Sequence, residues 1–185
     1  MRAKFYSQYI SEVFVLYRGQ QLDEVVPKIE VKTEILPLLY LDKKVTEEII
    51  KLQGYFSFAY LRLFYGSPET FLGLAWVGEK PALIEWAIPS RKLRHRYPFL
   101  PEKAYVLVDS YIAPQFVDDR IHLFLLQQII SSLPASNEYW VLVNEKHLAS
   151  IRGIEKAGAK HVGRYVRKRW LWGCLRSTKY HPDEA

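Results

Sequence analysis

The chain has 185 residues, of which 49% are hydrophobic and 15% aromatic, with a formal net charge of +6. This composition excludes a disordered chain, and the length suits one domain with a sizeable core. A single cysteine, Cys174, excludes an internal disulfide and a cysteine-based zinc site. The first residues lack the apolar core of a signal peptide, and no apolar run reaches bilayer length. We therefore expect a cytoplasmic protein without a membrane segment.

The first half of the chain is expected to form mostly strands. Val13–Tyr17 is typical of a strand, and Thr46–Leu52 is typical of a helix. Three further strands are predicted from aromatic and branched residues: Tyr55–Tyr65, Phe71–Val77 and Ala82–Ile88. The basic segment Pro89–Pro101, which is bounded by prolines, is expected to be a loop.

The second half alternates strands with helices. The predicted elements are a strand at Ala104–Ile112, a helix at Asp119–Leu133, a strand at Tyr139–Val143, a short helix ending at Gly158, and one or two strands over His161–Trp172. The helix between the first two of these strands has the length of a crossover connection. We therefore expect both strands to be parallel neighbours in one mixed sheet flanked by helices.

The short helix carries the most specific pattern in the chain. Ser150-Ile151-Arg152, followed by Glu155-Lys156-Ala157-Gly158, resembles the fourth-helix signature of the GNAT superfamily of acyl-CoA-dependent N-acyltransferases. That signature reads roughly Asn-x-x-Ser-Ile-x-x-x-Glu-Lys-x-Gly-Phe. The resemblance is strongest over 55–173. It implies an α/β (α+β) fold with a single mixed, mostly antiparallel sheet, forming one domain over 1–185. It also implies transfer of an acetyl or other acyl group from acyl-CoA to a small-molecule or peptide amine.

The same resemblance points to a cofactor loop. In GNAT enzymes a glycine-rich loop before the third helix binds the coenzyme A pyrophosphate through backbone N–H groups. In the matching segment Val117 replaces an arginine, Asp118 and Arg120 replace two glycines, and His122 replaces a third small residue. An aspartate would repel the anion or cap the helix, whereas an arginine could bind it. The cofactor-binding residues implied are Ile112, Arg120, Ile121, His122, Leu123 and, at the motif asparagine, His147.

Amine acylation needs a proton acceptor and an acid for the leaving thiolate. Many GNAT enzymes use a tyrosine four residues after the signature serine as the acid, and here that residue is Ile154. The catalytic candidates are Asp109, Glu85 and Ser150, with a bound water as a further base. Each has a structural alternative: the carboxylates could face solvent or pair with arginine, and Ser150 could be a polar residue of the first helical turns. Asn144 is expected to cap the helix.

Two basic clusters, 91–96 and 164–169, raise the alternative of nucleic-acid binding. The net charge is modest and charge runs are usually solvated, so we expect no nucleic-acid partner. No histidine spacing predicts a metal site. A second open alternative is a GNAT-like binding module that has lost catalysis, and a homodimer is also left open.

Overall fold

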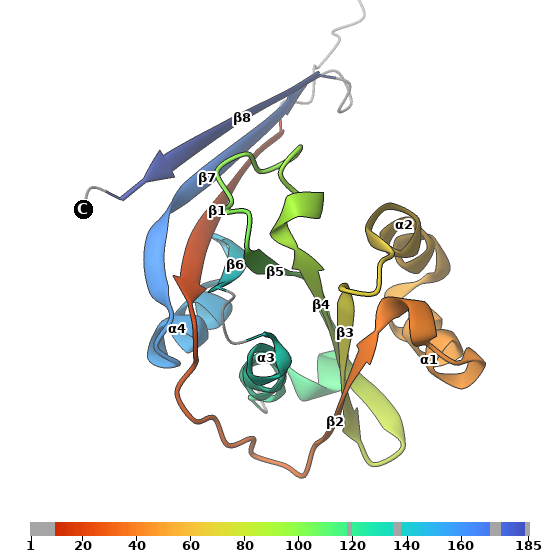
Figure 1. Cartoon of the computed structure of the whole chain (residues 1–185). Coiled ribbons are helices and arrows are strands. Elements are labelled where there is room, and N and C mark those ends of the chain that lie inside the picture. Colours follow the sequence, from red (N-terminus) through yellow and green to blue (C-terminus); the bar gives the residue numbers. More distant parts are fainter. Residues whose placement is uncertain (1–9, 118–119, 135–137, 171–174, 184–185) are drawn as a thin grey trace, which may run out of the picture.

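The computed structural model describes residues 10–117, 120–134, 138–170 and 175–183. These residues form one eight-stranded sheet in the order β2-β3-β4-β5-β6-β1-β7-β8 (Figure 1). The strands are β1 (Ile10–Gly19), β2 (Lys32–Pro37), β3 (Phe71–Val77), β4 (Lys80–Pro89), β5 (Ala104–Ile112), β6 (Glu138–Asn144), β7 (Lys160–Trp170) and β8 (Leu175–Pro182). The helices are α1 (Lys43–Gln53), α2 (Tyr55–Tyr65), α3 (Ile121–Ser132) and α4 (Leu148–Lys156). The expected fold class, a mixed and mostly antiparallel sheet flanked by helices, is confirmed.

The pairing of β5 with β6 is the one parallel pairing among the described strands. Helix α3 connects these two strands, as the crossover length predicted. Their pairing runs only from Ala104↔Glu138 to Leu107↔Val141. Beyond it, β5 continues along β4 to Ile112, and β6 continues along β1 to Asn144. The two strands therefore separate at their carboxyl ends.

The helices cover the two faces of the sheet. Helices α1 and α2 lie together over one face of β3 and β4, and α3 lies over the opposite face (Figure 1). Each face has its own apolar cluster. Leu125 and Ile129 of α3 belong to one, and Phe58 and Leu61 of α2 belong to the other. Burial of these side chains is the main source of stability for both layers.

The segment Tyr55–Tyr65 was wrongly predicted to be a strand, since the structure makes it helix α2. Its buried residues Phe58, Leu61 and Tyr65 recur at helical intervals of three and four. Gly54, with φ of +90°, separates it from α1. Aromatic side chains also fill the solvent face, where Phe56 is 88% exposed, so the sequence shows no helical period.

Two strands were not predicted, β2 and β8, and they form the two edges of the sheet. The first strand, β1, pairs with β6 and β7, far from the strands that follow it in sequence.

In the part of the chain that the structure describes, no helix has both the length and the hydropathy needed to cross a bilayer.

The ends of the site helices differ partly from expectation. Gly158, with φ of +90°, follows α4 as predicted. Asn144 is not the N-cap of α4, because that position belongs to His147. The Asn144 side chain instead accepts a hydrogen bond from the backbone N–H of Lys146 at 3.0 Å, within the preceding turn. Asp118 and Asp119, the predicted caps of α3, lie outside the described residues.

Candidate functional site

The separation of β5 from β6 creates an opening with a distinctive polarity. Helix α3 begins after β5, and α4 begins after β6. Since the strands are parallel, both helices begin at the same edge of the sheet. Helix N-termini carry partial positive charge and unsatisfied N–H groups, and open sheets bind ligands at such strand ends. The opening is therefore a candidate site for an anionic ligand.

A cluster of three polar side chains lies on the α3 face of this opening. Glu85 of β4 is only 1% exposed, and its carboxylate accepts a hydrogen bond from the hydroxyl of Ser110 in β5. His122, in the first turn of α3, places Nε2 3.3 Å from Glu85 Oε2 and 3.2 Å from Ser110 Oγ. A buried carboxylate requires such partners, because desolvating an isolated charge costs several kcal/mol. The His122 side chain keeps 23% of its surface exposed, so it can reach a ligand.

A β-bulge brings Ser110 into this cluster. Ile84 pairs with Tyr111 and Trp86 pairs with Val108, so Glu85 opposes two residues of β5, Asp109 and Ser110. Bulges re-aim side chains and leave one residue without ladder partners. Ser110 was not predicted as a site residue, and no local sequence pattern indicates a bulge here. The side chain of Asp109 lies outside the described ones, so its role as a base stays a prediction.

Arg120 begins helix α3 in a left-handed conformation, with φ of 58° and ψ of 14°. It is the one described non-glycine residue with positive φ. Arg120 stands where the GNAT loop has a glycine, so the chain keeps the glycine conformation with an arginine side chain. No side chain among the described residues caps the helix. Its first N–H groups and the exposed guanidinium therefore point to anion binding.

The left-handed conformation predicts a difference between two variants. Arg120→Gly and Arg120→Ala both remove the guanidinium, but only glycine relieves the steric cost of positive φ. Arg120→Gly should be the more stable of the two by about 1 kcal/mol. Denaturant unfolding of both purified variants measures this difference. Equal stabilities would show that Arg120 does not hold this conformation in solution.

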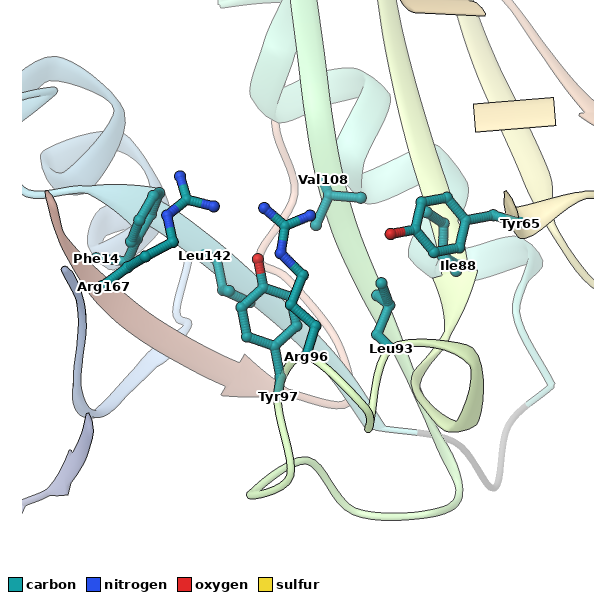
Figure 2. A pocket seen from close by; sticks show the side chains of 9 residues that line it. All are labelled: Phe14, Tyr65, Ile88, Leu93, Arg96, Tyr97, Val108, Leu142 and Arg167. Carbon is teal, nitrogen blue, oxygen red and sulfur yellow. The ribbon is translucent and has the colours of Figure 1, made fainter. Parts of the chain in front are cut away.

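A cavity of about 120 Å³ lies on the opposite face, beside the same two strands. Val108 of β5 and Leu142 of β6, which follow the last paired residues, form part of its wall. The remaining lining residues are Phe14, Tyr65, Ile88, Leu93, Arg96, Tyr97 and Arg167. Figure 2 shows the Tyr65 hydroxyl pointing toward the Arg96 guanidinium. This cavity was not predicted, although Arg96 belongs to the basic segment that we expected to be a loop.

The charges in this cavity are unevenly paired. Arg167 binds Glu12 through two nitrogens, with distances of 2.8 Å and 2.7 Å to Oε2. Arg96 forms no ion pair with any described carboxylate, and its guanidinium lies 5.4 Å from the ring centroid of Tyr97. Burial, followed by the neighbouring Tyr60, raises the pKa of Tyr65 despite the opposing effect of Arg96. The Tyr65 phenol therefore stays protonated and can donate a hydrogen bond.

The remaining residues predicted for the site differ in how far their side chains are buried. Ile121 is fully buried, so only its backbone groups can face a ligand, and the partly buried side chains of Ile112 and Leu123 pack against the same apolar cluster. At the start of α4, His147 is exposed and Ser150 is partly buried. Of the predicted set, the structure brings Glu85 and His122 into direct contact.

The signature of the fourth helix attaches α4 to the rest of the fold. Glu155 accepts a hydrogen bond of 2.8 Å from the hydroxyl of Tyr17 in β1. The backbone N–H of Asp23 donates to Ala157 at 2.9 Å, beside the left-handed Gly158. Glu155 and Gly158 of the signature therefore have a structural role, which is to hold α4 against the rest of the fold. Ile154 occupies the position of the usual tyrosine acid, but its aliphatic side chain has no proton to donate. It is 1% exposed and belongs to the core.

Comparison with known proteins shows the fold through structure rather than sequence. No protein-family model and no curated protein matches this chain. Three similar structures are a functionally unknown conserved protein from Staphylococcus epidermidis ATCC 12228, a GNAT-family acetyltransferase from Colwellia psychrerythraea, and a proposed GNAT-family acetyltransferase from Novosphingobium aromaticivorans DSM 12444. Their TM-scores are 0.62, 0.57 and 0.54, and their sequence identities are 11%, 13% and 8%.

These matches cover 87%, 89% and 90% of this chain but only 62%, 57% and 67% of the respective proteins. The chain therefore has a GNAT-like fold, and it spans about two thirds or less of the length of these proteins. This confirms the GNAT-like fold that the resemblance in the fourth helix implied.

Proposed function

We propose that this protein transfers an acyl group from acyl-CoA to an amine. The observation that carries the proposal is the opening between β5 and β6, where the start of α3 and the Glu85–His122 pair meet. The structural similarity to GNAT-family acetyltransferases supports the same reading. Acetyl-CoA is the donor that these neighbours suggest, and other acyl-CoA thioesters fit the same chemistry.

The start of α3 provides the groups that an acyl-CoA pyrophosphate needs. The backbone N–H groups of Ile121, His122 and Leu123 belong to a first helical turn that no described side chain caps. The Arg120 guanidinium adds a cation that can bind phosphate through two nitrogens. These groups fit a coenzyme A pyrophosphate on the α3 face, while the opening would receive the thioester. Bound there, acyl-CoA supplies an activated acyl group.

His122 is the proposed proton acceptor, and Glu85 is its positioning residue. The neutral imidazole can take a proton from the attacking amine, since part of the ring is exposed. Glu85 is buried against His122 and Ser110, so it orients the ring and stabilises the imidazolium that forms. This arrangement assigns Glu85 a role through His122 rather than direct contact with the amine.

One observation favours the second candidate, a binding module without catalysis. The position of the usual GNAT tyrosine is occupied by Ile154, which lies in the core. Without a side-chain acid there, the leaving thiolate has to take its proton from water or from the imidazolium of His122. The two candidates agree on acyl-CoA binding and differ in turnover.

The test is to incubate the protein with acetyl-CoA and a panel of amines, while following thiol release and the mass of the acylated product. Release that depends on both amine and protein supports the enzyme. Saturable acetyl-CoA binding without product would establish the binding module instead. If neither binding nor product is seen, both proposals fail.

A further inference from the structure

The cavity beside Val108 and Leu142 contains an arginine that the proposed transfer chemistry does not use. Arg96 comes from the loop after β4, is partly buried, and lacks an ion pair with any described carboxylate. A buried guanidinium is usually paired with an anion, because its desolvated charge is otherwise uncompensated. The Tyr65 hydroxyl and the Tyr97 ring surround it without neutralising its charge.

The lining of the cavity carries one uncompensated positive charge, so it suits a ligand with one negative charge. Among the described lining residues, Arg96 and Arg167 are the two cations, and Glu12 neutralises Arg167. One positive charge therefore remains, at Arg96. A guanidinium binds a carboxylate through two parallel hydrogen bonds, and the Tyr65 hydroxyl can donate a third.

The size and walls of the cavity restrict the rest of the ligand. Its volume of about 120 Å³ is well below the roughly 300 to 1,000 Å³ of pockets that enclose whole drug-sized ligands. It therefore suits one end of a small molecule. Phe14, Ile88 and Leu93 give it apolar and aromatic walls. Since Val108 and Leu142 border both the cavity and the opening, a ligand held here can extend toward the start of α3.

We propose that this cavity selects acceptor amines that also carry a carboxylate and an apolar side chain, as hydrophobic and aromatic amino acids do, and that Arg96 is the residue that recognises the carboxylate. The proposal rests on the acyltransferase function. The amine nitrogen forms a bond to the thioester carbonyl carbon, the carbon–sulfur bond breaks, and the sulfur leaves as a thiolate. The proton lost by the amine passes to His122 and then to the thiolate.

The turnover test compares matched acceptors that differ only in the carboxylate: phenylalanine with phenethylamine, tyrosine with tyramine, and tryptophan with tryptamine. The amino acid of each pair should have the higher kcat/KM, by roughly ten- to hundredfold, as expected for a hydrogen-bonded charge pair. Arg96→Gln should abolish this preference, mainly by raising KM for the amino acid. Arg94→Gln, an exposed arginine of the same loop, is the matched control and should retain the preference.

A binding test separates this proposal from the proposed function. The probe, 3-phenylpropanoate, carries the carboxylate and the ring but has no amine to acylate. It should bind the wild type and Arg94→Gln in a saturable titration, and bind Arg96→Gln roughly tenfold or more weakly. That result without any turnover would support the carboxylate site and reject the enzyme. Turnover with equal kcat/KM within each pair, or an unchanged preference in folded Arg96→Gln, would overturn the carboxylate site alone.

Discussion

Replacing His122 with glutamine is expected to lower the rate of acyl transfer by about a hundredfold or more, because general base catalysis contributes roughly 10² to 10⁴. Glutamine keeps a polar group beside Glu85 and Ser110 but cannot accept the amine proton. The KM for acyl-CoA should change little, since the backbone N–H of residue 122 is retained. Steady-state kinetics over a range of pH values measures both parameters.

The matched control is His181→Gln, an exposed histidine of β8. It should retain wild-type kinetics. If His122→Gln keeps the wild-type kcat and pH profile, His122 is not the proton acceptor. The base would then be Asp109 or Glu85, the two carboxylates predicted from the sequence, or a bound water.

Replacing Glu85 with leucine is expected to move stability and activity in opposite directions. The carboxylate is 1% exposed in a largely apolar layer, and an apolar residue of similar volume avoids its desolvation cost. The free energy of unfolding should stay equal or rise, because the groups left without this partner, Ser110 and the imidazole of His122, both keep access to solvent. Acyl transfer should fall strongly, because His122 loses the group that orients it. Denaturant unfolding and steady-state kinetics measure the two effects.

Glu85→Gln is the matched control, because glutamine has nearly the same shape as glutamate but carries no charge. It keeps hydrogen bonding to Ser110 and His122 but removes the charge, so it should lose activity without the gain in stability expected for leucine. A leucine variant that unfolds more easily than the wild type would show that the Glu85 contacts stabilise the fold on balance. A leucine variant with full activity would remove Glu85 from the mechanism.

Elements with clear boundaries and connections could be predicted from the sequence. The strands Ala104–Ile112 and Glu138–Asn144 are bounded by charged and turn residues, and the helix between them required a parallel pairing. Tyr55–Tyr65 could not be predicted correctly, because its solvent face is as aromatic as its buried face. With only Ser57 and Arg62 as polar residues on the exposed side, the segment loses the period that separates helix from strand.

The site was only partly predictable, because its contacts depend on tertiary structure. Glu85 was recognised as an acidic residue inside an apolar strand, and His122 as part of the cofactor loop. The contact between them depends on how α3 docks on β4, and Ser110 joins them through a bulge. The sequence does not single out Arg96, because it belongs to a run of basic residues, and such runs usually face solvent. Only its burial beside Tyr65 and Tyr97 distinguishes it from Arg94.

The proposed function requires that the start of α3 binds acyl-CoA at the opening between β5 and β6. Calorimetric titration of acetyl-CoA into the wild type, Arg120→Glu and Arg62→Glu measures this binding. We predict saturable binding by the wild type, weakening by roughly tenfold or more in Arg120→Glu, and no change in Arg62→Glu, where the exposed arginine lies on α2. Absence of binding by the wild type, or equal affinities for the wild type and Arg120→Glu, would contradict the claim.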